Sequence, residues 1–254
     1  MKTITIQKED HGVARLIINS GRGNPITPQF VQELNQAMDQ LLTSPPRALV
    51  IDANGAKIFS GGFALPIIAE WKRDKLWAFF TDFLKGMHKI LEIQCPTVTA
   101  IEGHAIAGGF ILSLASDFRV VRKEGVKLGL SEVDLGVAVP AGARTLLETR
   151  TSVPDALWLS ATGELISPQR ALEIKLAVSL SDNPLEKAIE IATMLAQKPG
   201  EGAAVTRVLT NKPILERMHL ETERGKQAFL DTWFSEVGQQ CIQGLAAKLG
   251  ARKS

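Results

Sequence analysis

The chain has 254 residues, of which 45% are hydrophobic and 22% are charged, and its 29 basic and 27 acidic residues leave a net charge of +2. A chain of this length can bury a sufficient core without disulfides, and the balanced charge gives no reason to expect a nucleic-acid or membrane partner. The two cysteines have neither a disulfide framework nor a metal-ligand spacing. Because the first residues lack the apolar run of a signal peptide, the expected location is the cytoplasm.

The first half of the chain alternates predicted strands and helices. Residues 3–7 and 13–18 predict a β-hairpin, and Thr27-Pro28 is a typical start for the amphipathic helix predicted over 30–42. The next expected elements are a strand over 48–51, a helix over 76–93, a strand over 98–101, a helix over 110–116 and a strand over 118–121. This order predicts an α/β fold, a layered sheet with right-handed crossovers.

Helices dominate the predicted second half. They are expected over residues 155–160, 168–175, 185–197, 202–209, 215–233 and 236–249. We therefore expect an α/β core over residues 1–195, followed over 196–254 by a helical region that serves in oligomerisation or as a lid. Large apolar side chains in that region favour assembly, namely Leu220, Phe229, Trp233 and Phe234.

Several common cofactor motifs are absent from the sequence. It contains no P-loop, no G-x-G-x-x-G that opens a helix after a strand, and no G-x-S-x-G elbow. The four histidines have no metal-ligand spacing with acids or cysteines. We therefore expect neither a metal nor a separate cofactor.

Two glycine-bearing turns are the first candidates for chemistry. One covers residues 59–63 (FSGGF), and the other covers residues 103–109 (GHAIAGG) between a predicted strand and a helix. Glycine permits close backbone approach, and the N–H groups that begin a helix are unpaired at the positive end of its dipole. Two such turns could direct two N–H donors at one oxyanion. Taken singly, each is more typical of a tight connection.

Glu132 is the acidic candidate. It lies in the apolar segment 128–136 (LGLSEVDLG). Taken alone, an acid at this place is more typical of the start of a helix than of a catalytic group.

These three segments, in this order, resemble the crotonase (enoyl-CoA hydratase/isomerase) superfamily. Residues 57–63 resemble the first oxyanion turn of the family, whose N–H donor falls on Phe63. Residues 100–110 resemble its central signature, whose second donor falls on Gly108. Glu132 matches the second of the two glutamates that hydratases of the family carry.

The resemblance extends over most of the chain, because residues 13–19, 161–171 and 234–236 also match segments of the family. It implies a crotonase-like spiral core of layered β-sheet and helix with an all-helical C-terminal region. It also implies an acyl-CoA substrate, which carries the CoA itself, and assembly as a homotrimer or as a hexamer built from two trimers. The residues that it places around the substrate are Ser60, Gly61, Gly62, Ala107, Gly109 and Ile111.

Two positions depart from the family pattern. Hydratases carry their first glutamate where this chain has Ile111, and many members have Asp where it has Ala64. Addition of water to an alkene needs an acid and a base, whereas movement of a proton between two carbons needs one carboxylate. The resemblance therefore favours a 3-enoyl-CoA to trans-2-enoyl-CoA isomerase with Glu132 as the proton shuttle.

Other members of the superfamily remain open as alternatives. A hydratase-like enzyme, a decarboxylase or a thioester hydrolase could use the same oxyanion hole, with Asp134 as the nearest spare acid. A non-catalytic acyl-CoA binder or interaction subunit is also possible, although Glu132 and both turns are intact. His104 in the second turn is more typical of a structural side chain that flanks the loop.

Overall fold

The computed structural model describes residues 2–251, and its main element is a six-stranded sheet with the order β1-β2-β3-β5-β7-β9. β1 pairs with β2 in the antiparallel sense and the other neighbours are parallel. The strands are β1 (Ile4–Lys8), β2 (Val13–Ile18), β3 (Ala48–Asp52), β5 (Thr97–Ile101), β7 (Phe118–Arg122) and β9 (Ser179–Ser181). The predicted α/β order is confirmed, but β9 was not predicted, because three residues with two serines carry no strand pattern.

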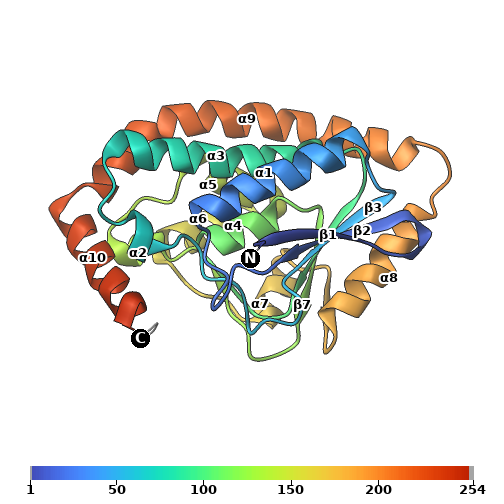
Figure 1. Cartoon of the computed structure of the whole chain (residues 1–254), viewed down its shortest axis with the longest axis horizontal. Coiled ribbons are helices and arrows are strands. Elements are labelled where there is room, and N and C mark those ends of the chain that lie inside the picture. The colour runs from blue at the N-terminus through green and yellow to red at the C-terminus, as the bar shows by residue number, and fades with distance from the viewer. Residues whose placement is uncertain (1, 252–254) are drawn as a thin grey trace.

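Helices cover both faces of this sheet. α1 (Pro28–Thr43) and α3 (Arg73–Glu92) pack together on one face, and α8 (Pro184–Ala196) covers β3, β5 and β7 on the other (Figure 1). Residues of β3 alternate between the two cores, because Leu49 and Ile51 face one while Ala48 and Val50 face the other. A strand buried on both faces explains the continuous apolar run of β3.

A second, three-stranded sheet has the order β4-β6-β8, with all strands parallel. It consists of β4 (Ile58–Ser60), β6 (His104–Ile106) and β8 (Leu128–Gly129). The sequence did not predict it, because two or three residues are too few to show a period. This small sheet positions the candidate site, since each strand leads directly into one of the three segments singled out above.

Short helices fill the connections between the two sheets and the C-terminal region. They are α2 (Leu65–Ile68), α4 (Gly108–Leu114), α5 (Ala141–Arg150), α6 (Val153–Thr162) and α7 (Pro168–Glu173), with the 3-10 turns η1 (Asp10–Gly12) and η2 (Glu132–Leu135). α5 was not predicted. It packs closely on the long C-terminal helix, where a Cβ on Gly142 would lie 2.2 Å from the Thr222 hydroxyl oxygen.

The C-terminal region consists of α9 (Gly202–Trp233) and α10 (Glu236–Ala251). The prediction of separate helices over 202–209 and 215–233 is wrong, because α9 continues through Pro213. Proline removes one hydrogen bond from a helix interior, but buried contacts on both sides of it keep the helix continuous. Arg207 and Asn211 are buried before Pro213, and Met218 is buried after it.

The aromatic side chains of α9 pack inside their own chain. Phe229 and Trp233 are each only 4% exposed, and the Phe229 ring stacks on Phe80 of α3 at 5.0 Å between ring centroids. These two residues are therefore unavailable for assembly, contrary to the expectation from sequence. α9 packs along α3 and α5 (Figure 1). The division into a core over residues 1–195 and a separate helical region over 196–254 remains a prediction.

Arg207 anchors α9 to the core through a set of buried polar contacts, which we call the Arg207 cluster. Its guanidinium donates to the Asp117 carboxylate at 2.6 Å and to the carbonyls of Ile90 and Leu91 at 2.7 and 2.8 Å. Asp117 also accepts from the N–H and hydroxyl of Thr97. A buried charge is thus paired with an acid and with carbonyls at the end of α3.

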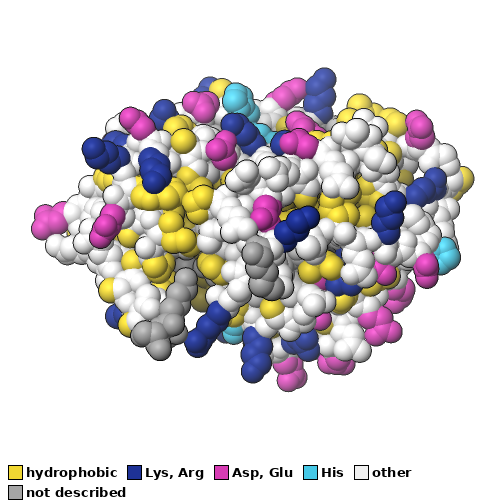
Figure 2. All heavy atoms as spheres, viewed as in Figure 1, with side chains coloured by type: hydrophobic (Ala, Val, Ile, Leu, Met, Phe, Trp, Pro, Cys, Tyr) yellow, Lys and Arg dark blue, Asp and Glu magenta, His cyan; other side chains and the backbone are white. Residues whose placement is uncertain are grey.

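The surface carries mixed charge. Lys and Arg side chains are scattered among Asp and Glu on the face shown in Figure 2, without a continuous basic field on that face. Within residues 2–251, none of the helices combines the length and hydrophobicity needed to cross a bilayer.

Candidate active site

The first turn follows β4 and is held by the loop around Asn24. Gly62 has a φ of +85°, a conformation that glycine adopts without steric cost. The buried Ser60 hydroxyl donates to the Asn24 carbonyl at 2.8 Å and accepts from the Gly62 N–H at 3.2 Å. The Gly61 N–H donates to the Gly23 carbonyl at 2.9 Å. The backbone of this turn is therefore fixed on both sides of Gly62.

The N–H of Phe63 is left unpaired by this arrangement. The Ile26 N–H donates to the Gly62 carbonyl at 2.8 Å and the Ala64 N–H donates to the Ile26 carbonyl at 3.0 Å. Backbone groups alternate in direction along an extended segment, so the Phe63 N–H points away from Ile26. It donates to no other residue within 2–251. The Phe63 ring packs edge-on against Phe79 and Phe83 of α3, which fixes the residue from inside.

The second turn joins β6 to α4. Ala107 has φ 50° and ψ −125°, a conformation rare for a residue with a side chain. Its N–H donates to the Gly129 carbonyl at 2.9 Å, and its own carbonyl accepts from the Ile111 N–H at 3.0 Å. Gly108 is the first residue of α4, so its N–H has no partner within the helix. A Cβ on Gly109 would lie 2.2 Å from the Ser60 carbonyl oxygen, so close packing on β4 requires glycine there.

The two turns lie against each other. A Cβ on Gly62 would be 3.2 Å from the Gly108 nitrogen and 3.1 Å from the Ala107 Cβ. A Cβ on Gly108 would be 3.5 Å from the Phe63 ring. The unpaired N–H groups of Phe63 and Gly108 thus belong to backbone segments in contact, and two such donors side by side can bind an oxyanion.

Glu132 follows the third strand of the small sheet. β8 pairs with β6 through Ala105↔Leu128 and Ile106↔Gly129, and the chain reaches Glu132 three residues after Gly129. Glu132 begins the 3-10 turn η2, which ends on left-handed Gly136, and Ser131 provides no side-chain cap. The link from Gly129 to Ala107 thus ties the Glu132 segment to the second turn.

The Glu132 carboxylate lies in an apolar setting. The residue as a whole is partly exposed, but its Oε2 atom is buried and has no hydrogen-bond partner within residues 2–251. Among the described residues 2–251, no other carboxylate oxygen is both buried and without a hydrogen-bond partner. Burial raises the pKa of Glu132 to about 7, and a hydrogen bond with its own backbone lowers the pKa by a smaller amount. A carboxylate with a pKa near neutrality is suited to take up and return a proton.

The other candidate acids and bases face elsewhere. The Asp134 carboxylate lies at the end of α6, where its oxygens would be 3.1 and 3.2 Å from a Cβ on Gly163. The His104 Nδ1 accepts from the Lys127 N–H at 3.0 Å, which links β6 to the segment before β8. His104 thus has a structural contact. Ile111, on α4, is buried at 1% exposure.

The part that Asn24 plays in the first turn was not predicted from sequence. Asn24 is 3% exposed with a φ of 43°, its amide donates to the Ile58 carbonyl at 3.1 Å, and its side-chain oxygen accepts from the Ser20 N–H at 2.8 Å. The available signal was the glycine-rich loop 20–25 (SGRGNP). Ala64, where many members carry Asp, is buried at 5%, and Ile26 holds its backbone.

A pocket of about 260 Å³ opens beside the first turn. Its walls include Gly61, Gly62 and Phe63, together with α2 and Leu249 of α10. Within residues 2–251, no three His, Cys, Asp or Glu side chains are clustered as metal ligands would be.

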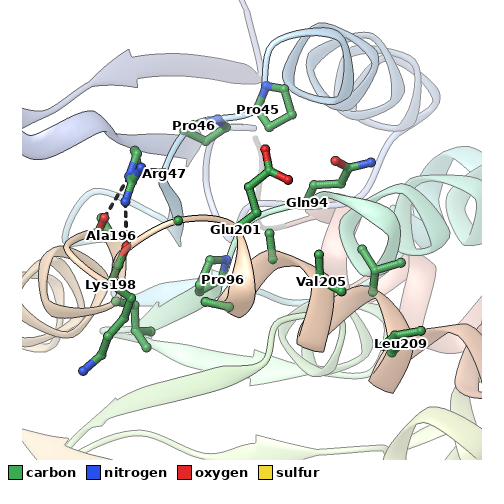
Figure 3. Close-up of a pocket in the computed structure, with 15 residues that line it drawn as sticks. Pro45, Pro46, Arg47, Gln94, Pro96, Ala196, Lys198, Glu201, Val205 and Leu209 are labelled. Atoms are coloured by element: carbon green, nitrogen blue, oxygen red, sulfur yellow. Dashed lines mark hydrogen bonds between the residues drawn. The ribbon is translucent and has the colours of Figure 1, made fainter.

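A larger pocket of about 450 Å³ lies elsewhere, between the loop at Pro45 and Pro46 and the start of α9 (Figure 3). Arg47 closes one side by donating to the carbonyls of Ala196 and Lys198 at 2.8 Å each. This pocket contains neither turn nor Glu132. Its volume alone therefore does not make it the active site, because Phe63, which carries one of the two unpaired N–H donors, lines the smaller pocket.

An α/β core in which two unpaired backbone donors lie on segments in contact, with a carboxylate of raised pKa, has the groups that an enzyme needs to bind an oxyanion and to move a proton. Comparison gives the family: residues 8–248 match the model described as Enoyl-CoA hydratase/isomerase, and the chain belongs to this family. The protein is thus an enzyme of the enoyl-CoA hydratase/isomerase family, and the predicted crotonase-like fold is confirmed.

Three similar proteins illustrate the relationship. The chain is 31% identical to a Thermus thermophilus protein named "Putative enoyl-CoA hydratase", over 92% of this chain and 93% of the relative. It is 26% identical to the enoyl-CoA isomerase/hydratase fer4 of Mycosarcoma maydis, over 84% and 81%. The structure of human mitochondrial delta3-delta2-enoyl-CoA isomerase matches with a TM-score of 0.91 at 19% identity, covering 99% of this chain and 100% of that one. The last comparison shows the fold.

Proposed function

We propose that the protein is an acyl-CoA isomerase that converts 3-enoyl-CoA to trans-2-enoyl-CoA. The observation that carries the proposal is one carboxylate: within residues 2–251, only Glu132 has a buried carboxylate oxygen without a hydrogen-bond partner, and its pKa is near 7, while Asp134 faces α6. Where hydratases carry their first glutamate, this chain has the buried Ile111. One carboxylate is enough to move a proton between two carbons.

In the proposed mechanism, the thioester oxygen binds between the N–H groups of Phe63 and Gly108. Negative charge collects on that oxygen as Glu132 removes a proton from the α-carbon, and each donor is typically worth about 3 kcal/mol of barrier. Glu132 then returns the proton to the γ-carbon. The apolar side chain of Ile111 keeps water away from the dienolate.

The remaining predicted residues have supporting roles in this proposal. Ser60 and Gly61 hold the first turn by hydrogen bonds, and the left-handed Gly62 directs the next N–H outward. Ala107 and Gly109 hold the second turn against β8 and β4. The pocket beside the first turn is the proposed place where the thioester end of the acyl-CoA enters.

Hydration is the second candidate function. It is favoured by the name of the Thermus thermophilus relative, "Putative enoyl-CoA hydratase". A hydratase needs a second group to hold and activate water on the alkene. The two functions therefore differ in a measurable ratio of activities on two substrates.

The test is a comparison of both activities in the purified enzyme. We expect conversion of 3-enoyl-CoA to 2-enoyl-CoA, with hydration of crotonyl-CoA at least about a hundredfold slower because one partner of the acid–base pair is missing. Ile111→Glu should raise hydration relative to isomerisation, and Ile111→Gln is the matched control of similar size without the acid. Efficient hydration by the wild-type enzyme would contradict the proposal.

We also propose a homotrimer or hexamer, as the family resemblance implies, and the cytoplasm as its location. Since Phe229 and Trp233 are buried within the chain, other apolar groups must form the interface. α6 exposes Val153, Leu157 and Trp158 at 61%, 64% and 58%. Light scattering at micromolar protein should give the mass of three or six chains, and a monomer would contradict this assembly.

A further inference from the structure

The Glu132 turn is held from outside by the junction of α9 and α10. The Ala138 N–H donates to the Thr232 hydroxyl oxygen at 3.0 Å, across 94 positions of sequence. Thr232 lies in the last turn of α9, and its hydroxyl proton is directed to the carbonyl of Phe229 at 2.9 Å or of Ala228 at 3.1 Å. The hydroxyl therefore both donates to a carbonyl of its own helix and accepts from the segment that follows Glu132.

The junction itself is tightly built. The Ser235 hydroxyl donates to the Thr232 carbonyl at 2.8 Å and accepts from the Gly238 N–H at 3.0 Å. A Cβ on Gly238 would lie 2.2 Å from that same carbonyl, so α10 starts directly against the end of α9. A Cβ on Gly136 would lie 3.2 Å from the Val237 side chain. The end of η2 at Gly136 therefore packs directly against the start of α10.

The contact at Ala138 is connected to Glu132 through the backbone. The Val137 N–H, one residue before Ala138, donates to the Glu132 carbonyl at 3.1 Å. On the opposite side, Val133 lies at Gly163, where α6 ends. Because Oε2 of Glu132 has no hydrogen-bond partner, the position of the carboxylate depends on its backbone and on packing.

We propose that Thr232 is a positioning residue for Glu132. By accepting from Ala138, it fixes the turn that aims the carboxylate at the carbon from which the proton is taken. The proposal rests on the proposed function, in which Glu132 touches the substrate and Thr232 does not. Without this contact, the carboxylate spends less time in reach of the α-carbon, while the oxyanion donors and the pocket are unchanged.

The test is Thr232→Val, which keeps the branched shape of the side chain and removes the acceptor. We expect kcat for isomerisation to fall by about tenfold or more with KM within about twofold, because the misplaced group acts in the chemical step. Thr232→Ser retains the hydroxyl and should restore most of kcat. The matched control is Thr210→Val, since Thr210 lies on α9 with the same hydroxyl contact to a preceding carbonyl, that of Thr206 at 2.8 Å.

Amide hydrogen exchange of the free enzyme separates this inference from the proposed function. Thr232→Val should speed exchange at Ala138 and Val137 by about tenfold or more while leaving α3 unchanged, because the loss is local. Faster exchange together with a wild-type enzyme that does not isomerise would support the contact and overturn the proposed function. Unchanged exchange, or wild-type kcat in Thr232→Val, would overturn the positioning role. Thr232→Ala replaces the valine variant if that variant does not fold.

Discussion

The Arg207 cluster and the candidate active site bury polar groups in opposite ways. In the cluster, the Arg207 guanidinium is paired with the Asp117 carboxylate and with carbonyls of α3. In the site, the N–H groups of Phe63 and Gly108 and the Oε2 of Glu132 have no partners within residues 2–251. Paired groups hold the fold together, whereas unpaired ones lower stability and are available to a ligand.

The largest expected effect is on the free energy of unfolding, and it tests the role of the paired groups in the Arg207 cluster. Arg207→Met should lower the free energy of unfolding by about 3–5 kcal/mol, because it removes the charged partner of Asp117, which keeps only Thr97 within residues 2–251, and a donor to carbonyls at the end of α3. The folded enzyme should retain its activity. Denaturant unfolding followed by circular dichroism measures the change.

Arg217→Met is the matched control for Arg207→Met. Arg217 also lies on α9 and pairs with Glu148, but its side chain is 51% exposed. We expect it to cost at most about 1 kcal/mol. Equal losses of stability in the two variants would refute the claim that the buried contacts of Arg207 stabilise the fold more than an exposed ion pair does.

A smaller effect, of about 3 kcal/mol on the barrier, is expected at the oxyanion donors. Gly108→Pro removes one N–H and should slow isomerisation by at least about a hundredfold. Gly202→Pro is the control, because Gly202 is likewise the first residue of a helix, with open space around it. Steady-state rates of the two folded variants give the comparison, and near-normal turnover in Gly108→Pro would count against the assigned donor.

The smallest effect concerns the stability cost of Glu132. Its pKa is raised by burial to about 7, above the value near 4.3 expected in the unfolded chain, so the folded state binds the proton more tightly. The stability that protonation contributes is complete below about pH 4 and is lost as the pH rises through 7. Glu132→Gln should therefore match the wild type at pH 4 and exceed it by roughly 2 kcal/mol at pH 8, reduced by partial exposure. Denaturant unfolding at both values would show a constant difference if Glu132 were not buried.

The main fold and the candidate active site also differ in how far they could be predicted from the sequence. The main sheet and the long helices carry clear periodic patterns, and residues 57–63 and 100–110 carry the family resemblance. The pairing of the small sheet and the contacts of Asn24 and Thr232 were not predicted, because they join distant segments, as Thr232 with Ala138 does. The helix break expected at Pro213 is absent, since tertiary packing of both halves of α9 overrides the local preference.

The pKa of Glu132 likewise could not be read from the chain. Taken alone in the segment 128–136, it was more typical of the start of a helix. Its burial depends on where η2 lies between α6 and the α9–α10 junction. Position along the sequence identified the acid, and the fold gave it an apolar setting.

The most direct test of the central claim is α-proton exchange on a saturated thioester. Butyryl-CoA can neither isomerise nor be hydrated, so deuterium incorporation at its α-carbon in heavy water reports enolate formation alone. We predict incorporation by the wild-type enzyme and a rate lower by about a thousandfold in Glu132→Gln, within the usual contribution of a general base. Binding of the thioester should be retained, since the donors are backbone groups. Wild-type exchange no faster than in buffer, or equal rates in the two proteins, would contradict the assignment of Glu132 and the oxyanion hole.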